Sequence, residues 1–190
     1  RQALAYQKAR RDAFLKLEGY APLERSFGLE GEETLTMVLP EQADPGAWKI
    51  NPAVSIGAPD FEQLERNELR YYGPLYGEDF TLRNNRRLRE KLTYHGAYLD
   101  GELAGSCYTW SAGGCTCLDS LLVDSAFRHR YVASTLLRAM AEQARREGTV
   151  LYLHADPEDT PKDMYARMGF QVVDRVYEYL CTDFAKLQLD

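Results

Sequence analysis

The spacing of hydrophobic positions predicts strands and helices along the whole chain. Apolar side chains within residues 1–19 are spaced as on a basic helix that stops near Gly19. The run Glu33–Leu39 alternates apolar and polar residues, which is typical of a half-buried strand. Prolines and a glycine then interrupt the pattern within residues 40–46. We therefore expect an N-terminal helix-strand segment over residues 1–44 and a separate domain over residues 45–190.

The next part of the chain predicts two helices and then an antiparallel meander. A short strand is expected around Trp48–Ile56, followed by a helix that begins at Pro59-Asp60 and a charged helix over about Asp79–Leu92. The aromatic stretch Tyr71–Gly77 between them is interpreted as a loop. Three strands follow, and the turn signals Asp100-Gly101 and Gly113-Gly114 join them: Tyr94–Leu99, Leu103–Trp110 and Cys115–Val123.

The last third of the chain alternates between helix and strand. A clear amphipathic stripe ends at Gly148, and the apolar run Val150–Leu153 predicts a strand buried on both faces. Thr160 is a good N-cap for a short helix that ends at Gly169, because Pro161 suits the first helical position. A final strand is expected from Phe170 to Leu180. The stripe consists of Ala133, Leu136, Leu137, Met140 and Ala144.

Composition and charge exclude several classes of function. With 45% hydrophobic and 27% charged residues, the 190-residue chain has the composition of a soluble globular protein, and no apolar run is long enough to span a bilayer. A net charge of −6 gives no general attraction to phosphate backbones or anionic lipid. We therefore expect neither a nucleic-acid partner nor a membrane partner.

Cysteine and histidine placement predicts no metal site. Cys115 and Cys117 are separated by one residue, which lacks the two-residue gap of a zinc knuckle. The three histidines are scattered along the chain. The four cysteines are interpreted as small buried hydrophobic residues in a reducing, cytoplasmic setting.

One segment combines a strand, a basic loop and a helix start. Arg128, His129 and Arg130 lie directly before the helix that begins at Val132, and Ala133 and Ser134 in its first turn are small. A helix N-terminus offers unpaired N–H groups and the positive end of the helix dipole, which suit a phosphate group. The arginines add charged donors at the same place.

The order of these elements resembles the GNAT superfamily of N-acetyltransferases. The phosphate motif of that family is matched by Val123, Ser125 in place of proline, Arg128, Tyr131 in place of glycine, and Ala133. Its tyrosine helix is matched by the segment 164–170, which ends in Gly-Phe. The resemblance implies an α/β (α+β) GNAT fold with a central mixed, mostly antiparallel sheet and flanking helices. Because Tyr131 replaces glycine, the backbone there must accommodate a side chain.

The resemblance also implies acetyl-CoA as the cofactor. Its pantetheine arm is expected in a V-shaped gap between the strands Cys115–Val123 and Val150–His154. A neutral amine then attacks the thioester directly. The expected cofactor-binding residues are Leu121, Leu122, Val123, Arg128, His129, Arg130, Tyr131, Val132, Ala133, Ser134, Thr160 and Tyr165.

The resemblance also implies two catalytic roles, a general acid and a general base. Tyr165 is the expected general acid for the departing thiolate, and its alternative is a core tyrosine on an amphipathic helix. Cys117 occupies the strand position where some members carry a basic carboxylate, so Asp119, two residues further on the same face, is the candidate base. Water and the aromatic residues Tyr71, Tyr72 and Tyr76 are the alternatives. A buried aspartate would have to be functional or paired.

The partner expected from the resemblance is the primary amine of a small molecule or a peptide. Tyr71, Tyr72 and Tyr76 are expected to line its pocket, and packing on the sheet is their alternative role. A homodimer with a second copy of the chain is a further expectation. Two other functions stay open, namely acyl-CoA binding without turnover and transfer of a longer acyl or aminoacyl group. Residues 1–44 loosely echo the segment Tyr165–Leu180, which suggests the remnant of a second GNAT-like half.

Overall fold

A computed structural model describes residues 15–181 and 187–188 of the chain. The chain divides into two compact units, one formed by residues 38–153 and the other by residues 1–37 together with 154–190. This division groups residues by their contacts with one another. It does not test the domain boundary that the sequence predicts at residue 44. Each unit is described by itself.

The unit of residues 38–153 contains most of the predicted elements. Within it, the strands pair in the order β7-β6-β5-β4-β3, with β6 and β7 parallel and the other neighbours antiparallel. This confirms the mixed, mostly antiparallel sheet and the three-stranded meander. The elements are η1 (Pro45–Ala47), β3 (Ser55–Gly57), α2 (Phe61–Tyr76), α3 (Glu78–Arg89), β4 (Thr93–Leu99), β5 (Glu102–Ala112), β6 (Cys115–Val123), η2 (Ser125–Phe127), α4 (Val132–Glu147) and β7 (Val150–Ala155).

Local turn chemistry explains the meander. Asp100 and Gly101 between β4 and β5 have φ angles of 56° and 83°, as a two-residue hairpin turn requires. Gly113 and Gly114 play the same part between β5 and β6, with φ angles of 58° and 78°. The register of the sheet is therefore set by two turns that the sequence predicts.

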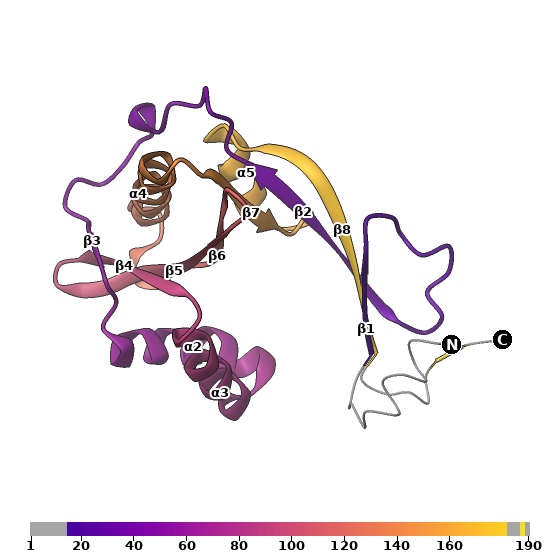
Figure 1. Cartoon of the computed structure of the whole chain (residues 1–190). Helices are drawn as coiled ribbons and strands as arrows, with labels where there is room; N and C mark the ends of the chain where they lie inside the picture. The colour runs from indigo at the N-terminus through magenta and orange to yellow at the C-terminus, as the bar shows by residue number, and fades with distance from the viewer. Residues whose placement is uncertain (1–14, 182–186, 189–190) are drawn as a thin grey trace. The chain divides into compact units, whose positions relative to one another are not determined.

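Helices cover both faces of this sheet, with α2 and α3 on one face and α4 on the other (Figure 1). On the α2 side, Leu64 packs with Tyr94 of β4 and Leu103 of β5 in a buried cluster. The buried positions of α4 include the whole predicted stripe except the half-buried Ala133. Gly148 ends α4 in the left-handed conformation, which confirms the predicted helix stop.

The aromatic stretch 71–76 is helical, so the predicted loop is wrong. Asp60 caps α2 by accepting hydrogen bonds from the Glu62 and Gln63 N–H groups, and the helix continues through Pro74 to Tyr76. A proline inside a helix removes one backbone hydrogen bond, and the helix ends two residues after Pro74. Gly77, with a φ of 86°, then separates α2 from α3.

In the other unit, the described residues form β1 (Leu15–Gly19), β2 (Glu30–Val38), α5 (Pro161–Arg167) and β8 (Gln171–Cys181). β1 pairs antiparallel with β8, from Leu15 opposite Cys181 to Gly19 opposite Tyr177. The predicted helix is therefore wrong for Leu15–Gly19, because hydrogen bonding to β8 decides the structure there. The rest of that helix lies outside the described residues.

Three smaller predictions also differ from the structure. The expected strand around Trp48–Ile56 is reduced to β3, which begins only at Ser55. Val150 is 47% exposed, so β7 is not buried on both faces. Thr160 precedes α5 but makes no capping hydrogen bond through its side chain. None of the helices within the described ranges combines the length and the hydropathy needed to cross a membrane.

Candidate functional site

Strand β6 is distorted close to its end. Ser106 of β5 lies opposite Leu122, but Tyr108 lies opposite Asp119, so β6 has one more residue than β5 in this interval. Ser120, within the bulge, has a φ of 50°. A β-bulge bends the strand and redirects its side chains, and such bulges are common beside active sites.

The parallel pairing of β6 with β7 stops just before this bulge. The ladder runs from Cys115 opposite Val150 to Leu118 opposite Leu153, whereas β6 continues to Val123. Leu121 and Val123, two of the predicted pantetheine-binding residues, therefore lie beyond the ladder. Leu122 between them is buried, with 7% of its surface exposed.

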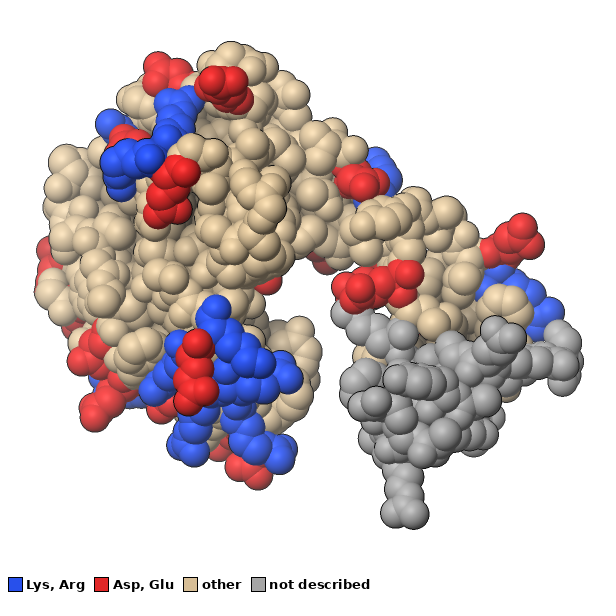
Figure 2. Space-filling view, viewed as in Figure 1, with Lys and Arg blue, Asp and Glu red and all other residues tan. Residues whose placement is uncertain are grey.

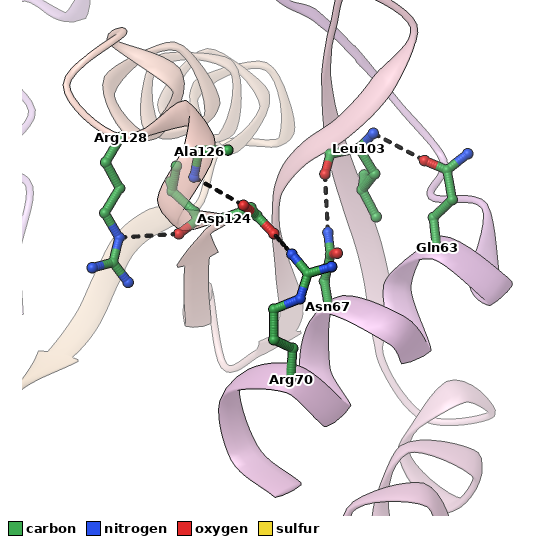
Figure 3. A network of polar contacts seen from close by, with 8 residues as sticks. Gln63, Asn67, Arg70, Leu103, Asp124, Ala126 and Arg128 are labelled. Atoms are coloured by element: carbon green, nitrogen blue, oxygen red, sulfur yellow. Dashed lines mark hydrogen bonds and ion pairs between the residues drawn. The ribbon is translucent and has the colours of Figure 1, made fainter. Parts of the chain in front are cut away.

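The loop after β6 is anchored by Asp124. Its carboxylate accepts a hydrogen bond from the Ala126 N–H at 3.0 Å, and its own N–H donates to the Ala104 carbonyl at 3.0 Å. Arg70 of α2 donates to the same carboxylate at 2.6 Å. Figure 3 shows Asp124 between Arg70 and the loop that carries Arg128. The start of the predicted phosphate loop is thus fixed to both β5 and α2.

The basic part of the loop contains two residues in the left-handed region. His129 and Tyr131 each have a φ of 60°, and Tyr131 is the N-cap residue of α4. A left-handed conformation costs a non-glycine residue about 1–2 kcal/mol. Tyr131 thus takes a backbone conformation that glycine adopts without strain. Its ring is 43% exposed, and Lys49 Nζ lies 4.6 Å from the ring centroid.

The first turn of α4 is open to a ligand. Tyr131 makes no side-chain capping hydrogen bond. The first N–H groups of any α-helix lack intrahelical partners, so those of Val132, Ala133 and Ser134 can bind an anion. The Ser134 hydroxyl is already engaged, because it donates to the Lys49 carbonyl at 2.7 Å.

Asn51 is a site residue that the sequence analysis missed. Its side-chain amide donates to the Arg130 carbonyl at 3.0 Å, and its backbone N–H donates to Thr135 Oγ1 at 3.0 Å. It therefore fixes the end of the basic loop against α4. The only local signal was an Asn-Pro pair in an irregular segment, which indicates a turn rather than a binding site.

The three basic residues of the loop have different surroundings. Arg128 Nε donates to the Val123 carbonyl at 3.4 Å, and its guanidinium lies 5.8 Å from the Tyr71 ring centroid. Arg130 is paired with Asp100 of the β4–β5 turn at 3.1 Å and stacks near Phe127. His129 is exposed. Arg128 is therefore the better placed of the two arginines for a ligand, since none of the carboxylates among the described residues forms an ion pair with it.

A pocket of about 230 Å³ lies beside Arg128, between α2 and the loop after β6. Its lining includes Arg70, Tyr71 and Leu122 as well as Arg128. Figure 2 also shows Lys and Arg side chains gathered over the α2–α3 part of the molecule. This second basic region, which includes Arg86, Arg87 and Arg89 in the last turn of α3, was not predicted.

Gly105 supports this site from the neighbouring strand. A Cβ atom at Gly105 would lie 2.9 Å from the Leu122 carbonyl oxygen and 3.0 Å from Val132 Cγ1. The end of β6 and the start of α4 can therefore approach β5 only because residue 105 has no side chain.

Asp119, the predicted base, is exposed rather than buried, which corrects the expectation. Its Oδ1 accepts a hydrogen bond from the Ser120 N–H. The bulge at Ser120 explains the difference, because it moves this part of β6 out of regular pairing. Burial raises the pKa of Tyr108, and nearby Asp119 adds to the increase while a hydrogen bond to Ser120 opposes it.

The predicted acceptor-pocket tyrosines line up along the C-terminal part of α2. Ring centroids are 5.4 Å apart for Tyr71 and Tyr72 and 6.2 Å apart for Tyr72 and Tyr76. Tyr71 is 46% and Tyr76 is 62% exposed, whereas Tyr72 is half-buried. Burial raises the pKa of Tyr72 to about 12, opposed by a hydrogen bond to Ser120.

Tyr165 and Thr160 belong to the unit of residues 1–37 and 154–190. Tyr165 is 7% exposed, and its ring packs edge-on against Phe170 with centroids 5.9 Å apart. Thr160 is exposed, and its N–H donates to Asp159 Oδ1 at 2.7 Å. The roles of both residues stay predictions.

The cysteines are free in the structure, and Cys107, Cys117 and Cys181 are buried. This confirms the predicted burial for these three cysteines, whereas Cys115 is only half-buried. Burial raises the pKa of the Cys117 thiol to about 11 and also raises that of Cys107. Within the described ranges, no group of three His, Cys, Asp or Glu residues is arranged to bind a metal ion.

This combination of an open helix start, a basic loop and a bulged strand agrees with sequence comparison. The model of the acetyltransferase (GNAT) family matches residues 59–170, more than half of the chain. The chain therefore belongs to the GNAT acetyltransferase family. No curated protein matches it by sequence.

Solved structures show the same fold at low sequence identity. A conserved protein of unknown function from Staphylococcus epidermidis ATCC 12228 has a TM-score of 0.79 and 16% identity, covering 95% of this chain and 77% of that one. A tandem GNAT protein from the clavulanic acid biosynthesis pathway has a TM-score of 0.67 and 17% identity, covering 95% and 68%. PaiA N-acetyltransferase from Thermoplasma acidophilum, in complex with coenzyme A, has a TM-score of 0.51 and 18% identity, covering 66% and 97%.

Proposed function

We propose that the protein transfers an acetyl group from acetyl-CoA to a primary amine of a small molecule or peptide by direct attack. The observation that carries this proposal is the N-terminus of α4, where Tyr131 makes no side-chain capping hydrogen bond. It is preceded by left-handed His129 and by Arg128, which pairs with no carboxylate of the described residues. These groups supply N–H donors and positive charge where pyrophosphate binds in the family.

The residues present fit acetyl-CoA. The N–H groups of residues 132–134 and the Arg128 guanidinium would hold phosphate, and main-chain groups of Leu121 and Val123 would hold the pantetheine arm. The early end of the β6–β7 ladder supports the latter role, because these main-chain groups lie beyond it. When bound, acetyl-CoA supplies an acetyl group activated as a thioester. The residues of the chain itself would orient the thioester and transfer protons.

Direct transfer needs no nucleophilic side chain. A nucleophilic cysteine must be available as a thiolate, and burial with a raised pKa keeps Cys107 and Cys117 protonated near neutral pH, which makes these two thiols poor nucleophiles. The proposed nucleophile is the amine itself. Tyr165 is the proposed acid for the leaving thiolate, a role that rests on the family motif.

The proposed acceptor surface is formed by Tyr71, Tyr72 and Tyr76. The exposed rings of Tyr71 and Tyr76 offer apolar faces to a planar or hydrophobic acceptor, and the Tyr72 ring packs beside both. The relative named as an aminoglycoside 6'-N-acetyltransferase shares only the fold, at 14% identity, so it does not indicate this acceptor.

Two measurements test the proposal. Acetyl-CoA should raise the melting temperature, because a ligand at 100 times its Kd stabilises a protein by about 2.7 kcal/mol. Free thiol should then appear when acetyl-CoA and a panel of primary amines are mixed with the protein. An unshifted melting curve at millimolar acetyl-CoA would contradict the proposal, and binding without thiol release would favour acyl-CoA binding without turnover.

A further inference from the structure

The C-terminal part of α2 and the start of α3 expose a row of apolar side chains. Four large hydrophobic residues between positions 71 and 80 are exposed, and Leu75 is the most exposed of them at 65%. The other three are Tyr71, Tyr76 and Phe80. Single apolar residues are normal on a protein surface, whereas a contiguous exposed patch marks an interaction site.

The aromatic rings of this patch pack against one another. Centroid separations of 5.4, 6.2 and 6.2 Å join, in turn, Tyr71, Tyr72, Tyr76 and Phe80. These four rings form an aromatic ladder that passes from α2 to α3 across Gly77. Extended peptide rises by about 3.3–3.6 Å per residue, so the ladder accommodates at most about five residues of a bound peptide.

Two arginines of α3 lie beyond the far end of the ladder. Arg83 and Arg87 follow Phe80 by three and seven residues, which places the three side chains on one helix face. Both arginines are exposed. Arg83 donates to the Asp79 carbonyl at 3.2 Å, and Arg87 donates to Asn84 Oδ1 at 3.0 Å. No ion pair joins either arginine to a carboxylate of the described residues, so their charge is available to a partner.

The other end of the ladder adjoins the proposed cofactor site. Tyr71 lines the pocket of about 230 Å³ beside Arg128, and the Arg128 guanidinium lies 5.8 Å from the Tyr71 ring centroid. Arg128 is the proposed phosphate ligand, so this end of the ladder faces the cofactor. An acceptor that lies along the ladder therefore has its amine at the Tyr71 end and its remote groups at the Phe80 end.

Charge distinguishes among the partners that could cover this surface. Lys and Arg side chains gather over α2 and α3 (Figure 2), but the whole chain carries a net charge of −6. A nucleic acid or an anionic membrane presents charge over an area wider than this patch, so the net charge opposes its approach. A short acidic segment meets only the local arginines and is attracted to them. Its apolar side chains can pack on the exposed rings.

We propose that this surface docks a peptide acceptor in which the reacting amine is followed by apolar residues and then by acidic residues; this inference deepens the proposed function and rests on it. The peptide lies along the aromatic ladder with its amine beside the pocket at Arg128. Its carboxylates pair with Arg83 and Arg87. The same arginines repel a basic peptide, so the surface selects by charge as well as by contact.

The binding test uses a peptide with a free N-terminal amine, about five apolar residues and then glutamates, labelled with a fluorophore at its C-terminus. The protein should bind it more tightly than the same peptide with lysines in place of the glutamates, and added salt should weaken the binding. Arg87→Glu should raise the Kd of the acidic peptide about tenfold, because the reversal replaces an attraction by a repulsion.

Arg146→Glu is the matched control. Arg146 is also an exposed arginine in the last turn of a helix, so both reversals oppose a helix dipole and should lower the melting temperature by similar small amounts. Only Arg87→Glu should change peptide binding. If the α3 arginines merely complement the dipole of their helix, the peptide binds equally to both variants, and the inference is overturned.

Two further variants separate the charged part of the surface from the aromatic part. The double variant Arg83→Gln/Arg87→Gln introduces no opposing charge and should raise the Kd of the acidic peptide without raising that of the lysine peptide. Phe80→Ala should raise the Kd of both peptides about fivefold or more, because truncation of an aromatic interface residue often costs that much. Unchanged binding by Phe80→Ala would contradict docking on the ladder.

Thiol release from acetyl-CoA connects docking with turnover. With the acidic peptide as acceptor, Arg87→Glu should raise KM and leave kcat almost unchanged, since docking contributes equally to the ground state and the transition state. If the acidic peptide binds no better than its lysine counterpart, the inference is overturned even where another amine is acetylated. Binding of single-stranded DNA or phosphatidylserine vesicles that depends on Arg87, without peptide binding, also overturns it. If no amine, the peptide included, releases thiol, the proposed function fails and the acceptor inference fails with it.

Discussion

Arg70 donates to the Asp124 carboxylate at 2.6 Å, which joins α2 to the loop that precedes α4. The two residues are separated by 54 positions in the sequence. The Asp124 side chain is only 9% exposed, whereas that of Arg70 is 68% exposed. The pair therefore connects the helix of the proposed acceptor surface with the proposed phosphate loop.

Asp124→Ala should weaken acetyl-CoA binding more than Arg70→Met does. Asp124 also accepts from the Ala126 N–H, so its replacement loosens the loop itself and should cost about 1 kcal/mol of stability. Arg70 is mostly exposed, and an exposed ion pair is worth at most about 1 kcal/mol. Calorimetric titration with acetyl-CoA and melting curves compare the two variants. Equal losses would show that the ion pair alone positions the loop.

Arg128→Ala should weaken coenzyme A binding about tenfold or more, because a hydrogen bond to a charged group is worth about 1.5–3 kcal/mol. Binding of pantetheine, which lacks the phosphates, should change little. Arg130→Ala should have a smaller effect than Arg128→Ala, since Arg130 is paired with Asp100. The dissociation constants of both ligands check this order. A larger effect at Arg130 would contradict the assignment of Arg128.

Gly105→Ala should destabilise the protein and weaken acetyl-CoA binding together. The new methyl group would meet the Leu122 carbonyl oxygen at 2.9 Å, and a backbone atom can move away only if β6 shifts. Overpacking of this kind costs about 1–3 kcal/mol. Gly57→Ala is the matched control, because a Cβ there meets nothing within 4 Å. A normal melting temperature for Gly105→Ala would show that β6 can shift away from the methyl group without a loss of stability.

Tyr165→Phe should lower kcat and leave acetyl-CoA binding almost unchanged, because an acid for the thiolate acts in the transition state. We expect about a 100-fold loss, since a thiolate is already a fair leaving group. The competing core role predicts a lower melting temperature and near-normal turnover instead. Steady-state kinetics and melting curves on one preparation distinguish the two roles.

The sequence alone determined the elements whose signals are local. The Asp100-Gly101 hairpin, the buried stripe of α4 and its end at Gly148 all depend on residues close together in the chain, and all are confirmed. The match of residues around Val123 and Ala133 to the family motif also identified the family that the comparison shows. These predictions succeeded because turn and helix propensities act over a few residues.

Tertiary structure decided which of these residues are buried, paired or free. Glu65 and Glu68 lie three residues apart on one helix, yet only Glu65 is bonded to Arg89, because the packing of α3 and β4 determines each environment. The strand at Leu15–Gly19 likewise depends on its pairing with β8, which lies more than 150 residues away. Local spacing cannot show such contacts, since burial and the resulting pKa shifts arise only when distant segments pack together.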